Sequence, residues 1–335
     1  MPMIDLSTKY GRLNLHSPII AGSSGLTDNI ESLKELESHG AGAVVLKSLF
    51  EEEILREMKA ELNGMSSSGF IYPETLEFYD YFDGPKESTA DYLELIRNAR
   101  KELKIPVIAS INCIGAEYWT YFPKQIEQAG ADALELNIFN LPSDLNKTAE
   151  ENEKVYFDII RQVKEQVKIP LFIKLSFYSS RLGSFFNEIS KTGIDGLVLF
   201  NRFYNPDIDI DKLEITSGAV LSTPADIHQS LRWIAILSDQ LSCCLIASTG
   251  VHSAEGVIKQ ILAGACAVQV ASTLYKNGIK HLNKMTAELK TWMSEKGFEK
   301  LEDFRGMLSQ QKSIDPALYS RVQFMKYFRG FKPEP

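Results

Sequence analysis

Four segments of the chain share one pattern, in which the end of a helical repeat is followed by a glycine, a small residue and a short apolar run. A glycine at such a join suits the left-handed C-cap of a helix, because it has no side chain to clash. The continuous apolar run that follows predicts a strand buried on both faces. The segments are 39–48, 129–139, 192–201 and 263–272, and their join glycines are Gly40, Gly130, Gly193 and Gly264.

Apolar runs of a second kind alternate strictly with these four segments. They lie at 17–22, 105–112, 169–175 and 243–249. In three of them a proline stands at or just before the strand entry, where its missing N–H is tolerated. The two kinds together predict eight strands.

Helical patterns fill the gaps between the predicted strands. Apolar residues recur at three- and four-residue spacing over 30–39, 117–128, 151–166, 224–240 and 253–263. Ser253 with Gly256 marks the start of one helix, and Thr223 followed by Pro224 marks another. Strands that alternate with helices predict a parallel sheet. Eight quasi-repeated units favour closure as a (β/α)8 TIM barrel over the alternative, an open α/β sheet with coincidental glycine joins.

Two long segments are predicted to form loops over the C-terminal face of this barrel. About sixty residues separate the second and third strands, and they include the polar, Gly/Ser-rich stretch 65–74. Residues 201–222 extend the loop after the sixth strand. Active sites of such barrels lie on this face, so the two loops predict a covered pocket. We expect a single domain over 1–335, with a helical tail from about residue 309.

Composition and charge narrow the classes of protein that fit. The chain has 335 residues, of which 44% are hydrophobic and 24% charged, which excludes disorder, collagen and coiled coil. The net charge of -8 opposes binding to nucleic acid. The four cysteines lack the spacing of a zinc site or a disulfide framework. No signal peptide and no apolar run of membrane-spanning length is present, so we expect a cytoplasmic protein.

Small hydroxyl residues end the last two strands, at 247–250 and 270–274. Loops after strands seven and eight of such barrels frequently bind a phosphate group. Gly250 allows close approach of the backbone to an anion, while Thr249 and Ser272 can donate hydroxyl hydrogen bonds. These residues fit a phosphorylated cofactor or a sugar phosphate, and they fit ordinary strand-end turns equally well.

Lysines and asparagines gather at the same level of the predicted barrel. Lys47 and Lys174 each end an apolar strand, where burial without a partner is costly, so we expect both in the barrel mouth. Such a lysine can form a Schiff base or hold negative charge on a cofactor ring. Asn112, Asn137 and Asn201 also stand at strand ends. Their amides offer donors and acceptors that suit a flat polar heterocycle.

From about residue 18 to 308, the chain resembles the dihydroorotate dehydrogenases. The resemblance rests on AGSSG followed by IESLKELESHGAGAVVLKS, on ELNI, IKL and STG, on GACAVQVASTLYKNG, and on the tail GFEKLEDFRGML. It implies a soluble, class 1-like flavoprotein of TIM-barrel fold that uses FMN. Such an oxidoreductase oxidises dihydroorotate to orotate, a CH–CH dehydrogenation in pyrimidine biosynthesis.

The resemblance also implies a cofactor site. The residues carried over as FMN contacts are Gly22, Ser23, Lys47, Ser48, Asn112, Asn137, Lys174, Gly218, Thr249, Gly250, Ala271 and Ser272. Lys174 would stabilise negative charge on the reduced ring, and the residues from Gly218 onward would hold the phosphate end. Thr249 stands where the family has a glycine.

The substrate end departs from the family pattern. The family has Asn-x-Ser-(Cys/Ser)-Pro-Asn after the fourth strand, with Cys or Ser as the base, whereas this chain has Asn-Ile-Phe-Asn-Leu-Pro over 137–142. Asn140 occupies the base position, and an amide has no useful basicity near neutral pH. Substrate contacts carried over are Lys47, Ser66, Asn137 and Asn201, of which Ser66 replaces an asparagine. Cys113 and Tyr178 are two less favoured candidates for a side chain that replaces the base.

Two other functions stay open at this point. The chain can be a flavin-binding paralogue that has lost this chemistry and acts on another substrate or as a binding protein. It can also be a lyase that uses Lys174 as a Schiff base, with a sugar phosphate in the phosphate site. We expect a small-molecule substrate and a homodimer, with no membrane, nucleic-acid or metal partner. A separate electron-transfer subunit is compatible with the sequence, whereas quinone is not the expected acceptor.

Overall fold

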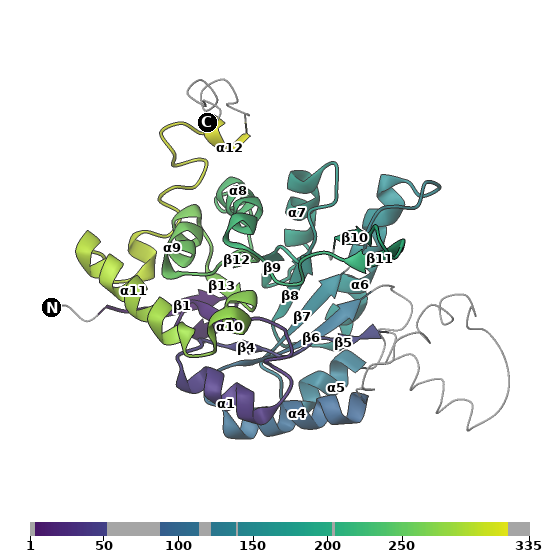
Figure 1. Ribbon diagram of the computed structural model, residues 1–335, viewed down its shortest axis with the longest axis horizontal. Coiled ribbons are helices and arrows are strands. Elements are labelled where there is room, and N and C mark those ends of the chain that lie inside the picture. Colours follow the sequence, from purple (N-terminus) through teal and green to yellow (C-terminus); the bar gives the residue numbers. More distant parts are fainter. Residues whose placement is uncertain (1–3, 52–87, 114–121, 139, 203–204, 321–335) are drawn as a thin grey trace.

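Eight parallel strands close into a barrel (Figure 1). The computed structural model describes residues 4–51, 88–113, 122–138, 140–202 and 205–320. β13 pairs with β3 and β4 pairs with β6, so the sheet has no open side and the predicted TIM barrel is confirmed. The short strand β5 (Leu49–Phe50) pairs with β6 beyond β4. The barrel strands are β3 (Ile19–Ala21), β4 (Val44–Val45), β6 (Val107–Cys113), β7 (Ala133–Ile138), β8 (Leu171–Leu175), β9 (Gly196–Leu199), β12 (Cys244–Ser248) and β13 (Ala267–Val270).

Helices surround the barrel. In Figure 1, α1, α4 and α5 lie on one side of it, and α7, α8 and α9 lie on the opposite side. The helices are α1 (Ile30–Ser38), α4 (Thr89–Glu102), α5 (Phe122–Ala129), α6 (Ala149–Gln166), α7 (Leu182–Ser190), α8 (Ile227–Leu237), α9 (Ala254–Ala263), α10 (Ser272–Asn277), α11 (His281–Lys296) and α12 (Ala317–Ser320), with 3-10 turns at Pro224–Asp226 and Leu301–Asp303. Among the described helices, none combines the length and apolar character needed to cross a membrane.

The predicted glycine joins and helix starts are confirmed. Gly40, Gly130, Gly193 and Gly264 all have positive φ, between 78° and 120°. The Ser253 side chain accepts from the N–H of Gly256 at the start of α9. The four glycines therefore mark where α1, α5, α7 and α9 end and the next strand begins, and Ser253 marks the start of α9.

The long segment between the second and third strands contains more structure than the sequence analysis predicted. Its last part forms α4, which packs on the barrel with Tyr92, Leu93, Ile96 and Ala99 buried. The stretch 65–74, with Ser66, lies outside the described residues. The segment is therefore not a loop throughout, because α4 is a regular helix of the barrel's outer layer.

The second predicted loop, 201–222, contains an antiparallel hairpin of β10 (Pro206–Asp209) and β11 (Glu214–Ser217). Ile208 lies directly opposite Ile215, and both are exposed. The hairpin follows β9 and so belongs to the C-terminal face of the barrel (Figure 1). After residue 309 the described part of the chain includes the short helix α12 (Ala317–Ser320), and the helical tail as a whole stays a prediction.

A small hairpin closes the barrel at its other end. It consists of β1 (Thr8–Tyr10) and β2 (Leu13–Leu15). Tyr10 is fully buried and packs on Phe172 of β8, with 4.0 Å between ring centroids. Together with Leu15, Ile20 and Ile108 it belongs to an apolar cluster inside the barrel. The barrel is therefore a filled core, and its C-terminal end is where a site can form.

Candidate functional site

A cavity of about 170 Å³ lies at the C-terminal ends of the strands. Eight of the residues predicted from the sequence line it, namely Gly22, Ser23, Lys174, Asn201, Thr249, Gly250, Ala271 and Ser272. They come from both ends of the chain, and the closure of β3 against β13 brings them together. The structure thus gathers in one place most of the flavin contacts that the resemblance implied.

Three of the predicted polar residues stand in one row across neighbouring strands. Asn112 of β6 is in register with Asn137 of β7, which is in register with Lys174 of β8. The side chain of Asn201 donates to Asn137 Oδ1 at 2.9 Å and accepts from the N–H of Arg202. Asn112 Oδ1 is buried and has no hydrogen-bond partner among the described residues. The strand ends therefore carry one hydrogen-bonded pair of amides, Asn137 with Asn201, and beside it Asn112, whose acceptor is unpaired within the described part of the structure.

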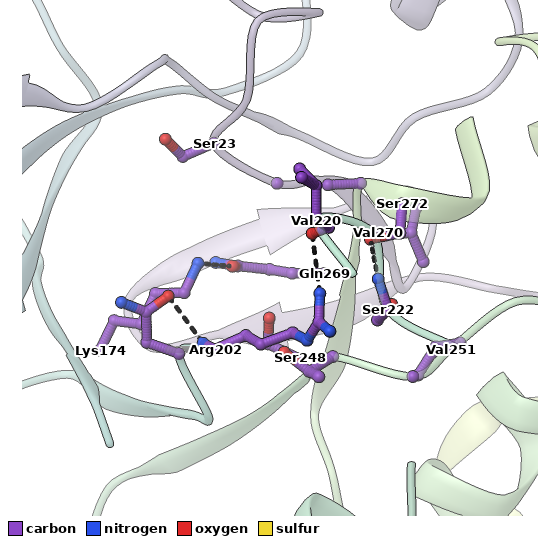
Figure 2. A pocket seen from close by; sticks show the side chains of 15 residues that line it. Ser23, Lys174, Arg202, Val220, Ser222, Ser248, Val251, Gln269, Val270 and Ser272 are labelled. Carbon is purple, nitrogen blue, oxygen red and sulfur yellow. Dashed lines mark hydrogen bonds between the residues drawn. The ribbon is translucent and has the colours of Figure 1, made fainter. Parts of the chain in front are cut away.

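Lys174 is held by two buried side chains that the sequence analysis missed. Its Nζ lies 3.6 Å from Glu135 Oε1 and donates to Gln269 Oε1 at 3.3 Å. Gln269 also donates to the other carboxylate oxygen of Glu135. Figure 2 shows the side chains of Lys174 and Gln269 pointing toward one another. Glu135 is fully buried and Gln269 nearly so, and this triad fixes the ammonium group at the floor of the cavity.

A signal for these two residues existed in the sequence. Glu135 and Gln269 interrupt the apolar runs ALELNI and AVQV. A carboxylate inside a buried strand needs a partner, and Lys174, on the strand next to Glu135, is a cation that can supply it.

Three serines link the first two barrel strands to β6. The N–H of Ser48 donates to Ser23 Oγ at 2.9 Å, and the Ser48 and Ser110 hydroxyls lie 2.7 Å apart. Ser48 thus supports Ser23, which lines the cavity. Lys47, which follows β4, donates its N–H to Thr27 O and is not among the residues that line the cavity.

The loop after β12 has a backbone conformation that favours glycine. Thr249 and Gly250 both have positive φ, 73° and 79°. A Cβ on Gly250 would stand 2.1 Å from the backbone nitrogen of Ile227, so this position requires glycine. The Thr249 hydroxyl donates to Phe200 O at 3.0 Å, which supports the unusual conformation of a β-branched residue.

Hydroxyl, amide and guanidinium groups surround this end of the cavity. The N–H of Ser222 donates to Ser272 Oγ at 3.0 Å. Arg202, which the sequence analysis did not single out, lines the cavity and donates to Val220 O at 2.7 Å (Figure 2). Gly218 lies outside the lining, and its N–H donates to Asn205 O beside the β10–β11 hairpin.

His252 lies behind this end of the cavity. Its Nε2 is 3.0 Å from the Ser222 hydroxyl. Burial, and then the positive charge of Lys276, lower the pKa of His252. His252 is therefore neutral at physiological pH and positions Ser222 and its loop.

Asn140, which the resemblance assigns to the position of the family's base, is not among the residues that line this cavity. Its Nδ2 donates to Asn152 O of α6 at 3.3 Å, and it lines a separate small cavity with Tyr156 and Tyr178. Its neighbour Phe139 and the side chain of Cys113 lie outside the described parts of the structure. The described side chains thus include no general base beside Lys174 other than Glu135, which the lysine already pairs with.

Comparison with known proteins places the chain in a family. The family described as "Dihydroorotate dehydrogenase" matches residues 84–293, which is more than half of the chain. A relative from Thermoplasma volcanium, "Dihydroorotate dehydrogenase B (NAD(+)), catalytic subunit", is 30% identical over 316 residues, covering 91% of this chain and 99% of the relative. Relatives of the same name from Thermoplasma acidophilum (91% of this chain, 99% of the relative) and Methanocaldococcus jannaschii (90% and 97%) are 27% and 28% identical. The chain belongs to the dihydroorotate dehydrogenase family.

Proposed function

We propose that the chain is an FMN-dependent dehydrogenase that oxidises dihydroorotate, or a closely related dihydropyrimidine, to orotate in pyrimidine biosynthesis. The observation that carries the proposal is the fixed position of Lys174. Its ammonium group is held by Glu135 and Gln269 where the residues implied as flavin contacts converge. A fixed cation beside a cofactor ring stabilises negative charge that develops on the ring.

The residues present fit FMN by their chemistry. Lys174 would face the ring, and Asn112 Oδ1, which has no hydrogen-bond partner among the described residues, is an acceptor for a ring N–H. Thr249 and Gly250 with Ser272 would hold the phosphate end through backbone and hydroxyl donors, and Arg202 adds a cation there. When bound, FMN supplies the acceptor for the hydride that leaves the substrate.

The substrate contacts are proposed from the amides. Asn201 lines the cavity and donates to Asn137, which is not part of the lining. Each amide retains further donor or acceptor capacity for a ring carbonyl or N–H. Lys47 and Ser66 stay predictions, as does the role of Asn140 at the base position. With an amide there, we expect slow proton removal from dihydroorotate.

A second candidate is favoured by the geometry of Asn140. Since its side chain binds α6, the chain is also compatible with a flavin-binding relative that acts on another substrate or serves as a binding protein. Such a protein would hold FMN in the same cavity without reducing it by dihydroorotate. The alternative function, a lyase that forms a Schiff base at Lys174, loses support because the chain belongs to a family named for dehydrogenation.

The names of the relatives indicate which protein partner this chain could have. They are catalytic subunits of an enzyme named for NAD(+), and we propose that this chain likewise passes electrons through a partner subunit to NAD⁺. The homodimer and the cytoplasmic location stay predictions.

The test is an anaerobic titration of the FMN-loaded protein with dihydroorotate, followed by flavin absorbance. Loss of the oxidised flavin band, with one orotate formed per flavin, is the expected result. A flavin that binds but stays oxidised would sink the dihydroorotate assignment and favour the second candidate. Failure to bind FMN at all would reject both.

Two lysine-to-methionine variants separate the effect of the Lys174 charge from effects that any such substitution has on the protein. Lys174→Met should slow flavin reduction by at least tenfold, because the charge facing the ring is lost. Lys290→Met, on the exposed face of α11, is the matched control and should leave the rate unchanged. Equal rates for both variants would remove Lys174 from the mechanism.

A further inference from the structure

Lys174 contacts a buried carboxylate and also lines the cavity at the C-terminal ends of the strands. Its Nζ lies 3.6 Å from Glu135 Oε1, and its side chain keeps 11% of its surface exposed. Among the described residues that line the cavity there is no Asp or Glu, and Arg202 is the other charged one. Within the described part of the barrel, Glu135 is therefore the anion that Lys174 faces.

Gln269 joins the two charged groups in a fixed order. Its Oε1 accepts from Lys174 Nζ at 3.3 Å, and its Nε2 donates to Glu135 Oε2 (Figure 2 shows the contact with the lysine). Turning the amide over would place its NH2 group against the ammonium and its oxygen against the carboxylate. The two charges thus select one orientation of Gln269, and Gln269 in turn holds them at a set separation.

The side chain of Tyr10, inside the barrel, adds no second anion. Tyr10 is fully buried, and burial, followed by the negative charge of Glu135, raises the pKa of Tyr10 well above its usual value. Tyr10 therefore stays neutral across the pH range in which proteins work. The charge on Lys174 is balanced by Glu135 alone among these groups.

Burial and the carboxylate act on Lys174 in opposite directions. Burial of an amine favours its neutral form, whereas a carboxylate within about 4–6 Å favours the ammonium. When a buried pair loses its anion, the remaining cation is uncompensated, and a lysine can avoid that cost by giving up its proton. Loss of the Glu135 charge is therefore expected to change the protonation of Lys174 as well as the stability of the barrel.

We propose that Glu135, joined to Lys174 through Gln269, is a positioning residue that keeps the Lys174 side chain protonated in both redox states of the bound flavin. Reduction then takes up one proton for two electrons. The proposal rests on the FMN part of the proposed function and does not need dihydroorotate to be the substrate.

The proton count follows from the charges. When the substrate or an electrode supplies two electrons, one proton enters the ring system, the ring keeps one negative charge, and the Lys174 ammonium faces that charge without gaining or losing a proton. Without the Glu135 carboxylate, Lys174 is a neutral amine beside the oxidised ring. It then takes up a second proton when the ring becomes negative.

The experiment measures the midpoint potential of the FMN-loaded full-length protein against a reference dye, from neutral to alkaline pH. Proton uptake linked to an equilibrium sets its dependence on pH, so the slope of the potential against pH counts the protons. We expect the wild-type slope to correspond to one proton for two electrons. In Glu135→Gln the slope should double.

Three further variants separate the charge of Glu135 from its packing. Glu135→Asp keeps a carboxylate and should keep the wild-type slope. Glu135→Gln combined with Lys174→Met removes the amine that would take the second proton, so at alkaline pH the slope should return to the wild-type value. Glu255→Gln, on the exposed surface of α9, is the control and should change nothing.

Each result decides between the two proposals. A wild-type slope of two protons for two electrons would overturn the role of Glu135 even if Glu135→Gln does not fold. An unchanged slope in a folded Glu135→Gln, or an equal change in Glu135→Asp, would do the same. A wild-type protein that binds no FMN would instead reject the proposed function itself.

Discussion

At the scale of single residues, the buried pair of Glu135 and Lys174 constrains the cavity at the C-terminal ends of the strands most. Glu135 has no exposed surface, and its Oε1 faces the Lys174 ammonium at 3.6 Å with no hydrogen bond to any described residue. A buried ion pair contributes little net stability, but removal of one partner leaves the other charge uncompensated. The pair therefore fixes a cation at the site more than it stabilises the fold.

Glu135→Gln should lower the free energy of unfolding by about 3 kcal/mol, because Lys174 then carries an unpaired charge in the barrel. Urea unfolding with linear extrapolation measures the change. Glu255→Gln is the control, since Glu255 pairs with Lys259 on the exposed surface of α9; we expect no measurable loss there. A double variant, Glu135→Gln with Lys174→Met, should recover part of the loss. Equal effects at the two glutamates would show that the Glu135 charge is well solvated.

Some residues of the candidate site could be predicted from the sequence, and others could not. Lys174, Asn112, Asn137 and Asn201 could be found because each polar group ends an apolar strand. Arg202 gave no such signal, since it lies in a loop whose course depends on its contact with Val220. The position of Asn140 depends equally on packing against α6, which no local pattern encodes.

At the scale of elements, α6 shows how the chain fixes a helix start beside the barrel mouth. Thr148 Oγ1 accepts from the N–H of Glu151, and the Glu151 carboxylate accepts from the N–H of Thr148. This capping box satisfies two backbone donors at the start of the helix. The same helix carries Asn152, which binds Asn140, so the cap helps to set the loop after β7.

Thr148→Ala should lower the free energy of unfolding by about 1 kcal/mol, since the N–H of Glu151 loses its acceptor. Thr291→Ala makes the same chemical change in the interior of α11, where alanine favours the helix. Chemical denaturation of the two variants side by side should show a loss only for the first. A loss at Thr291 as large as that at Thr148 would mean that the capping bonds are not its cause.

Elements with strong local signals were predicted and those shaped by packing were not. Seven of the eight strands, and the starts of α9 and the 224–240 helix, carried glycine, serine or proline markers. α4 lay within a segment that the sequence analysis treated as an insertion, and α7 is short, with two phenylalanines and a glycine that blur its helical pattern. The β10–β11 hairpin is held by antiparallel pairing between its two strands. The sequence of either strand alone does not indicate this pairing.

At the scale of the whole molecule, the barrel is closed at one end and open at the other. The β1–β2 hairpin inserts Tyr10 against Phe172 at the closed end, and the cavity that Lys174 lines occupies the open end. Glu135 and Gln269 lie between them. The floor of the cavity therefore rests on the packing of Tyr10.

Tyr10→Ala should lower the free energy of unfolding by about 4 kcal/mol, as expected when a buried aromatic side chain leaves a cavity. Tyr10→Phe keeps the ring and removes a hydroxyl that has no hydrogen-bond partner among the described residues, so it should cost less than about 1 kcal/mol. Equilibrium unfolding of both variants measures the difference. A large loss in Tyr10→Phe would show that the hydroxyl, and not the ring, supports the barrel floor.

Closure of the barrel also has a consequence during synthesis. The pair that completes the sheet joins residues 19–21 to residues 268–270, so the first strand is made long before its partner. At about 5–20 residues per second, the interval is on the order of ten seconds or more. Until the last strand leaves the ribosome, the nascent sheet has two unpaired edges rich in β-branched and aliphatic residues, which are the segments that chaperones need to shield.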